Sequence, residues 1–365
     1  MSRKPVVRKG QGAQSNASGR YEILQRVSFD DGWNTLENSS SHESSRTQWR
    51  DDASRTVITR NRSPDIPFDR SVNPYRGCEH GCSYCFARPT HSWLGHSAGL
   101  DFERLLYAKR DAATLLKSEL ARPGYRCEPI AIGVNTDAYQ PLERKLRITR
   151  SLLELMCDCR HPVYLITKSS LIERDLDLLS DLAADALVTV TITITTLDNT
   201  LSSKLEPRAT APHRRLRTLK ILSDAGIPVR VSVSPIIPAL NEPDIESIVQ
   251  AAADAGADQA HCIILRLPHE LQQLFPEWLY AHYPLKARRV LKAVASMRGG
   301  KLNSSEFGNR MTGDGPRAAI IHQRFRHACL RAGIENRRTA GQLNTSLFSP
   351  PLNSPPTDQQ LNLDL

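Results

Sequence analysis

The chain has 365 residues, of which 40% are hydrophobic and 24% charged, a globular composition with enough length for a sizeable core. No apolar run reaches the roughly 18 residues of a membrane span, which argues against an integral membrane protein. The first ten residues are charged and lack the apolar stretch of a secretory signal. Eight cysteines without an export signal indicate a reducing compartment, and we therefore expect a cytoplasmic protein.

Composition divides the chain into four expected parts. We expect residues 1–62 to be a low-complexity N-terminal tail, because they hold no cysteine and include the Ser-rich run 39–45. Residues 339–365 contain Ser-Pro-Pro twice and are expected to be a C-terminal tail. A core domain is expected over 63–285, followed by a basic C-terminal extension over 286–338.

The net charge of +9 is concentrated in that extension. Residues 286–338 contain 13 Lys and Arg against three acidic residues, whereas the middle of the chain is mildly acidic. A block of this sign can bind a polyanion such as nucleic acid. It can equally be a solvated Arg-rich surface, and composition alone leaves both interpretations open.

Short apolar runs alternate with amphipathic segments from about residue 128 to 267. The first run, 129–134, predicts a strand, and the spacing of Ile148, Leu152 and Leu155 predicts the helix that follows. Further strands are expected at 163–166, 187–195, 229–236 and 261–267, with a helix between each pair. This order predicts parallel strands with right-handed crossovers, either in a doubly wound sheet or in a barrel.

One of these strands favours the barrel. Residues 188–195 alternate valine or isoleucine with threonine, whereas a strand covered on both faces should be apolar throughout. A barrel wall with helices outside and a wet lumen explains the threonine face, and an edge strand is the alternative. Five strands in succession end in polar residues, which is how an α/β barrel builds a site.

Three of the cysteines are close together. Cys78, Cys82 and Cys85 have the spacing C-x3-C-x2-C, in a loop made pliable by Gly77 and Gly81. Three thiolates from one loop can bind three irons of an iron–sulfur cubane. The ferredoxin run supplies a fourth thiolate, but the stretch 86–89 here has none, so one iron would be open to a substrate or cofactor.

Zinc is the rival ligand for these thiols, because it accepts a histidine as its fourth ligand and His80, His91 and His96 are near. Zinc sites usually take two cysteines from each of two arms, so three within eight residues favour the cluster. The other five cysteines are expected to be core thiols; they are Cys127, Cys157, Cys159, Cys262 and Cys329.

The cysteine spacing, with the aromatic Tyr84 before the third cysteine, resembles the radical S-adenosylmethionine (radical SAM) superfamily. The resemblance runs from about Ser71 to about Leu267. The flanking sequences are similar to the spore photoproduct lyase-like branch, uncharacterised relatives of a DNA repair enzyme; they are 73–78, 135–141, 167–169 and 205–208.

The resemblance implies an α/β fold, a partial (β/α)6 barrel of the TIM type with the cysteine loop after its first strand. It implies a [4Fe-4S] cluster on Cys78, Cys82 and Cys85, with S-adenosyl-L-methionine on the free iron. Reductive cleavage would give a 5′-deoxyadenosyl radical that abstracts hydrogen from the substrate, in a lyase-like enzyme of unknown reaction. An electron donor of the flavodoxin or ferredoxin type is the implied partner.

Five residues are candidates for binding the cofactor: Tyr84, Asn135, Thr136, Lys168 and Arg208. The resemblance carries over to three of them, and it places Thr136 and Lys168 where this branch contacts S-adenosylmethionine. Tyr84 would lie by the adenine, or simply pack. Lys168 could hold the carboxylate of the cofactor, with Arg208 as a weaker candidate, and it could also be a surface lysine. Asn135 and Asp137, which flank Thr136, could bind ribose or cap the following helix.

Two positions depart from the branch. Its hydrogen-return route uses a cysteine on the second strand, where this chain has Val134, and a tyrosine after the third cluster cysteine, where it has Phe86. Repair of the spore photoproduct itself is therefore not expected. Three hypotheses follow: a radical SAM enzyme acting on nucleic acid, one acting on a small molecule or protein, and a zinc-stabilised nucleic-acid-binding protein without catalysis.

Overall fold

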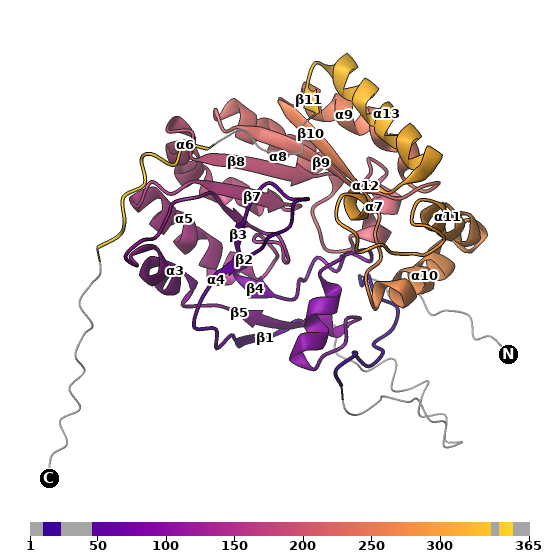
Figure 1. Ribbon diagram of the computed structural model, residues 1–365, viewed down its shortest axis with the longest axis horizontal. Helices are drawn as coiled ribbons and strands as arrows, with labels where there is room; N and C mark the ends of the chain where they lie inside the picture. Colours follow the sequence, from indigo (N-terminus) through magenta and orange to yellow (C-terminus); the bar gives the residue numbers. More distant parts are fainter. Residues whose placement is uncertain (1–9, 23–45, 337–342, 353–365) are drawn as a thin grey trace, which may run out of the picture.

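A single large sheet organises the computed structural model, which describes residues 10–22, 46–336 and 343–352 (Figure 1). The strand order is β11-β10-β9-β8-β7-β6-β3-β2. The six strands from β3 to β10 are parallel and stand in chain order. Their bounds are β3 Arg70–Val72, β6 Ile130–Ile132, β7 Val163–Thr167, β8 Val188–Thr193, β9 Val229–Ile236 and β10 Gln259–Ile264.

Two short strands extend this sheet at its edges. β2 (Ile58–Arg60) runs antiparallel to β3, and β11 (Glu335–Asn336) runs parallel to β10. Within the described ranges these two edges do not pair with each other, so the barrel is open on one side. The expected partial (β/α)6 barrel is confirmed, although the last strand begins and ends before the expected 261–267.

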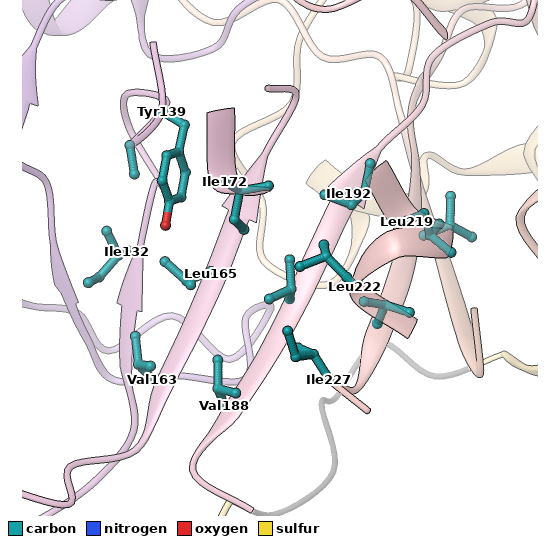
Figure 2. Close-up of a cluster of buried hydrophobic side chains, with 14 of the residues drawn as sticks. Ile132, Tyr139, Val163, Leu165, Ile172, Val188, Ile192, Leu219, Leu222 and Ile227 are labelled. Atoms are coloured by element: carbon teal, nitrogen blue, oxygen red, sulfur yellow. The ribbon is translucent and has the colours of Figure 1, made fainter. Parts of the chain in front are cut away.

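Helices cover the outer face of the sheet (Figure 1). The crossovers contain α3 Ala112–Leu120, α4 Glu143–Leu146, α5 Ile148–Asp158, η2 Ser170–Asp175, α6 Leu176–Ala184, α7 Asn199–Leu205, α8 Pro212–Asp224, η3 Glu242–Asp244 and α9 Ile245–Asp254. The predicted stripe of α5 is buried, with Ile148, Leu152 and Leu155 in the main core. Figure 2 shows the same core farther along, where Ile192 of β8 lies near Leu219 of α8, and Val188 of the same strand lies beside Val163 of β7.

The alternation in β8 has the predicted origin. Its valines and isoleucines belong to the core beneath the helices, so the threonines face the opposite side, the lumen. β8 lies between β7 and β9 in the centre of the sheet, which excludes the edge-strand alternative. Thr189, Thr191 and Thr193 are each at most 7% exposed, so the lumen is narrow as well as polar.

Part of the expected N-terminal tail belongs to the fold. β1 (Gln48–Asp51) pairs with β5 (Leu105–Ala108), which also pairs with β4 (Tyr75–Arg76), and these three strands form a second sheet. Residues 10–22 pack against the segment that contains η1 (Arg88–Leu94) and α2 (Asp101–Arg104). Residue 62 is therefore not a boundary of the fold. The remaining parts of the tail, 1–9 and 23–45, lie outside the described residues.

The basic extension is also integrated into the domain. α10 (Leu271–His282) is followed by α11 (Pro284–Ser296), α12 (Asn309–Thr312) and α13 (Gly315–Ala332), and α11 crosses the expected boundary at 285. α13 packs on α9 and leads into β11 at the edge of the main sheet (Figure 1).

Of the expected C-terminal tail, residues 343–352 are described. Phe348 packs edge-on against His161 with ring centroids 5.3 Å apart, and the Ser349 amide donates a hydrogen bond to the Cys159 carbonyl. This stretch is part of the fold, whereas 337–342 and 353–365 lie outside the described residues. Across the described ranges, no helix combines the length and apolar character that crossing a membrane would require.

Candidate active site

The three clustered cysteines lie on a loop after β3 and β4, at the carboxyl end of the first barrel strand. The loop folds back on itself, because the Gly81 amide donates to the Cys78 carbonyl at 3.3 Å and the Cys85 amide donates to the Cys82 carbonyl at 3.2 Å. Gly81 has a φ of 64°, and a Cβ there would collide with Glu103. The sharp turn thus requires glycine and sets the spacing of the thiols.

The loop thiols are shielded from solvent and unpaired by disulfides. Cys78 and Cys82 are buried and Cys85 is partly buried, and all three are free. Burial raises the pKa of Cys78 well above its usual value, and the charges of Asp137 and Cys82 raise it further. Burial also raises the pKa of Cys82 to about 12, although Lys168 opposes this. A metal that binds Cys78 and Cys82 must therefore displace their protons.

The donor set fits an iron–sulfur cluster. Soft thiolates are its ligands, and three of them on one short loop can each reach a separate iron. Such ligands surround a cluster and need not converge on one point. No group of three or more His, Cys, Asp or Glu side chains that could hold a metal ion is found in the portion of the chain that the structure describes.

Asp137, in the loop after β6, lies against Cys78. Its carboxylate accepts hydrogen bonds from the Thr167 hydroxyl at 2.6 Å and from the Lys168 amide at 2.8 Å. Burial raises the pKa of Asp137, but His80, Lys168 and the Thr167 bond outweigh it and hold the pKa well below its usual range. A fixed carboxylate therefore links the loops that follow β6 and β7.

Lys168 follows β7 and faces the cysteine loop. Burial lowers the pKa of Lys168, but the acidic groups around it, led by Cys82 and Glu206, raise it more, and the net shift is upward. The ammonium group therefore stays charged beside the thiols. The structure thus brings Lys168, one of the predicted cofactor-binding residues, to the cysteine loop. Lys168 is not a surface lysine, because it lies beside Cys82 and Glu206.

Tyr84 points from the cysteine loop into a buried polar network. Its hydroxyl donates to the carboxylate of Glu206, which also accepts from the Thr195 hydroxyl at 2.6 Å and forms an ion pair with Arg215. Burial and the charge of Glu206 raise the pKa of Tyr84 well above its usual value, so the phenol remains a donor. The side chain of Tyr84 therefore ties the cysteine loop to this buried network.

The other three predicted cofactor-binding residues have different settings. The buried Thr136 hydroxyl donates to the Tyr75 carbonyl at 3.2 Å, and the Asn135 amide donates to the Asn73 side chain at 2.9 Å. The guanidinium of Arg208 donates to the backbone carbonyl and the carboxylate of Glu103, at 3.2 and 3.4 Å. That ion pair accounts for the position of Arg208 without a bound anion.

Sequence reasoning missed several residues around the loop. Glu206 stands inside the quoted segment 205–208, so that motif could have pointed to it. Asp137 was considered only for ribose binding or helix capping. Arg88 and Glu103 form an ion pair in which both side chains are fully buried, and nothing in their sequence context marks them.

Comparison with known proteins places this site in a family. Residues 72–252 match the family model described as the Radical SAM superfamily. An uncharacterised protein of Mycobacterium tuberculosis is 33% identical over 221 residues, which is 60% of this chain and 65% of that protein. An uncharacterised protein of Methanocaldococcus jannaschii is 30% identical over 178 residues, 49% of this chain and 63% of that protein. The chain thus spans less than two thirds of these relatives.

Solved structures show the same architecture. A mutant of spore photoproduct lyase superposes with a TM-score of 0.59 and 14% sequence identity, over 87% of this chain and 88% of that one. Another mutant of that enzyme, with bound AdoMet and dinucleoside spore photoproduct, superposes with a TM-score of 0.56, 14% identity and 84% coverage of each chain. At 14% identity, this similarity shows a shared fold alone.

The open six-stranded parallel barrel and its cysteine loop define a radical SAM fold. Residues 72–252 match the Radical SAM superfamily, and the chain has the same fold as spore photoproduct lyase. The expectation drawn from the cysteine spacing and its flanking sequences is confirmed at this level.

Proposed function

We propose that Cys78, Cys82 and Cys85 bind a [4Fe-4S] cluster with one open iron, and that S-adenosyl-L-methionine binds there. The observation that supports this most is the loop itself, which holds three free, shielded thiols at the carboxyl end of the first barrel strand. When bound, these groups would supply a 5′-deoxyadenosyl radical for hydrogen abstraction. An electron donor of the flavodoxin or ferredoxin type would reduce the cluster.

The residues around the loop have separate roles in this proposal. Lys168 supplies a positive charge for the carboxylate of the cofactor, while Asp137 fixes the backbone on which Lys168 stands. Asn135 and Thr136 follow the same strand as Asp137. Asn135 takes the ribose-binding role in this proposal, and Thr136 contacts S-adenosylmethionine. The buried threonine face of β8 keeps the lumen polar and narrow, which excludes bulk water from a reactive site.

We further propose that the substrate is a polyanion, with nucleic acid as the leading class. Arg298, Arg310, Arg317 and Arg324 of the basic extension bind groups within the protein. By contrast, the exposed residues Lys286, Arg288, Arg289 and Lys292 on α11 show no ion pair with any described residue. This cationic face supports the proposal, and Phe86 and Val134 argue against spore photoproduct repair. The eight free thiols support a cytoplasmic location.

The test of the core proposal is a cysteine substitution in anaerobically purified protein. Cys82→Ala should abolish absorption near about 400 nm and the release of 5′-deoxyadenosine, because a cubane with two thiolates should not persist. Cys157→Ala is the matched control, since Cys157 is half-buried on α5, and it should retain both signals. Colourless wild-type protein with stoichiometric zinc, or full iron content in Cys82→Ala, would reject the assignment.

A further inference from the structure

Residues 10–22, here called the strap, lie across the outer side of the cysteine loop. Gln11, Gly12 and Ala13 of the strap are buried. The contact with the loop is so close that a Cβ added to Gly12 would come within 1.6 Å of the Gly81 carbonyl oxygen. Gly81 stands between the first two cysteines of the loop. The strap therefore touches the backbone that sets the position of the thiols.

Glu103 of α2 joins the strap to the rest of the site. Its carboxylate is fully buried and accepts hydrogen bonds from the Gly12 amide at 3.1 Å and from the Ala13 amide at 2.8 Å. It also forms a 2.5 Å ion pair with Arg88. Because a buried carboxylate is costly unless it is both paired and hydrogen-bonded, the two strap amides belong to the set of donors that compensates the burial of Glu103.

Arg88 carries the connection into the cysteine loop. Its Nε donates to the Cys82 carbonyl at 2.9 Å, and its Nη2 donates to the Gly81 carbonyl at 3.0 Å. Nη1 donates to the Gly99 carbonyl at 2.9 Å. A planar guanidinium held on several sides cannot rotate without breaking several bonds. The positions of Gly81 and Cys82 are thus coupled through Arg88 and Glu103 to the amides of the strap.

Further contacts anchor the rest of the strap to the same region. The side chain of Asn16 donates to the Asp101 carboxylate at 2.8 Å, and the Asp101 amide donates back to Asn16 at 3.0 Å. Ser97 donates to the Ala17 carbonyl at 2.5 Å. Near its end, Arg20 forms a 2.6 Å ion pair with Glu270, just before α10. The strap thus crosses from the cysteine loop to α10.

We propose that the strap fixes the cysteine loop in its metal-ligating conformation, with Glu103 and Arg88 as the positioning residues that transmit the contact. This inference rests on the proposed function, because it takes the loop to be the cluster-binding element. The three groups reach the loop through its backbone, as Arg88 does at the Gly81 and Cys82 carbonyls. They act by holding the backbone of Gly81 and Cys82, and the order they impose protects the bound cluster from loss.

The experiment compares Gly12→Ala and Glu103→Gln with wild-type full-length protein. Gly12→Ala displaces the strap from Gly81, and Glu103→Gln removes the charge that compensates Arg88. Glu154→Gln is the control, because Glu154 is exposed on α5 and pairs with Arg150 of the same helix. Hydrogen exchange of the peptide covering 78–88 is measured on metal-free protein. Loss of absorption near about 400 nm in the presence of an iron chelator is measured on reconstituted protein.

We expect exchange at 78–88 to rise at least about five-fold in both variants, the effect of losing one or two hydrogen bonds from a local opening equilibrium. Cluster loss should accelerate by a similar factor, and the electron paramagnetic resonance spectrum of the reduced cluster should change. A global stability defect alone would leave that spectrum unchanged in the molecules that retain a cluster. Glu154→Gln should match wild type in all three measurements.

The hydrogen-exchange measurement and the cluster-loss measurement together separate this inference from the proposed function. The exchange measurement needs no metal, so wild-type protein that takes up no cluster would reject the proposed function while the coupling of strap to loop is still measured. Exchange at 78–88 that is unchanged in Gly12→Ala overturns the inference. So does a reconstituted Gly12→Ala protein that keeps its cluster as long as wild type, with the same spectrum.

Discussion

The hydroxyl of Tyr84 donates a hydrogen bond to the carboxylate of Glu206, which joins the cysteine loop to the end of α7. Glu206 is 2% exposed and also pairs with the buried Arg215 of α8. Burial raises the pKa of Glu206, but Arg215 and Lys168 outweigh it and lower the pKa overall. One charged carboxylate therefore ties the cysteine loop to both helices of the crossover between β8 and β9.

Replacement of Glu206 tests how much this tie stabilises the fold. Glu206→Ala leaves Arg215 buried without its partner, and the free energy of unfolding should fall by about 3–5 kcal/mol. Urea denaturation monitored by circular dichroism measures it. Asp224→Ala is the control, because the Lys220–Asp224 pair is more than half exposed, and its loss should cost below about 0.5 kcal/mol. Equal losses in the two variants would contradict the assigned role.

His161 should make the stability of the protein depend on pH. Burial lowers the pKa of His161 to about 4, from an ordinary value of 6.5. The unfolded chain therefore binds more protons between these values, so stability is full above about pH 6.5 and declines as the pH falls toward 4. At pH 5 the contribution lost is about 2 kcal/mol. His161→Gln should reduce the difference in urea midpoint between pH 7.5 and pH 5.0.

Phe348 offers a second variant for the same test. Its ring packs edge-on against His161 from the C-terminal stretch 343–352. Phe348→Ala exposes the imidazole, which should return its pKa toward the ordinary value and shrink the pH-dependent loss. His213→Gln is the control for His161→Gln, because His213 is exposed, and it should leave the loss of stability on acidification as in wild type. If wild type, His161→Gln and Phe348→Ala lose equal stability on acidification, the burial of His161 is not the cause.

Asp65 and Arg310 connect the segment before β3 to α12, near the end of β10. The Asp65 carboxylate accepts from the Gly308 amide at 2.7 Å and pairs with Arg310 at 2.5 Å. Asp65→Ala removes both bonds, and hydrogen exchange of the peptide over 303–313 should rise by about ten-fold or more, because each bond is worth about 1 kcal/mol. Asp51→Ala is the control, because Asp51 forms an exposed ion pair with Arg110 at 4.0 Å, and it should leave the exchange of this peptide unchanged. An unchanged rate in Asp65→Ala would show that this pair does not hold α12.

The barrel was predictable because its signals are local. Alternation in β8 and the stripe of α5 repeat within a few residues, and each strand is followed by its own crossover. The last strand was placed too late in the chain because the polar Gln259 and the small Ala260 hide its beginning. Pairing with β9 on one side and with β11 on the other extends the strand through them.

The site was predictable only in part, for a related reason. Three cysteines within eight residues form a motif that a single segment displays, and Lys168 stands in a second short motif. Glu103 meets the strap amides across about 90 residues of chain, and neither partner has a periodic pattern around it. Residues 10–22 are small and polar, which is typical of a tail, and only tertiary contacts reveal that they pack.

The last prediction concerns the exposed basic face of α11. Its cations, Arg288, Arg289 and Lys292 among them, project from a helix whose other face is buried in the same apolar cluster as Cys82 and Tyr84. If this face holds a polyanion, neutralised phosphates release counterions, and about four contacts give a log–log salt slope near −3 to −4 on duplex DNA. Reversal of the three charges to Glu should weaken binding and flatten the slope without changing the iron content.

Three exposed cations on the other side of the barrel provide a control of equal charge: Arg122, Arg144 and Lys145. Their reversal changes the net charge by the same amount, so it separates a local surface from a general electrostatic effect. Fluorescence anisotropy with single- and double-stranded DNA and RNA, at two salt concentrations, measures both variants against wild type. Absence of binding at low salt, or an equal loss in the two triple variants, would exclude α11 as a polyanion surface and favour a small-molecule or protein substrate.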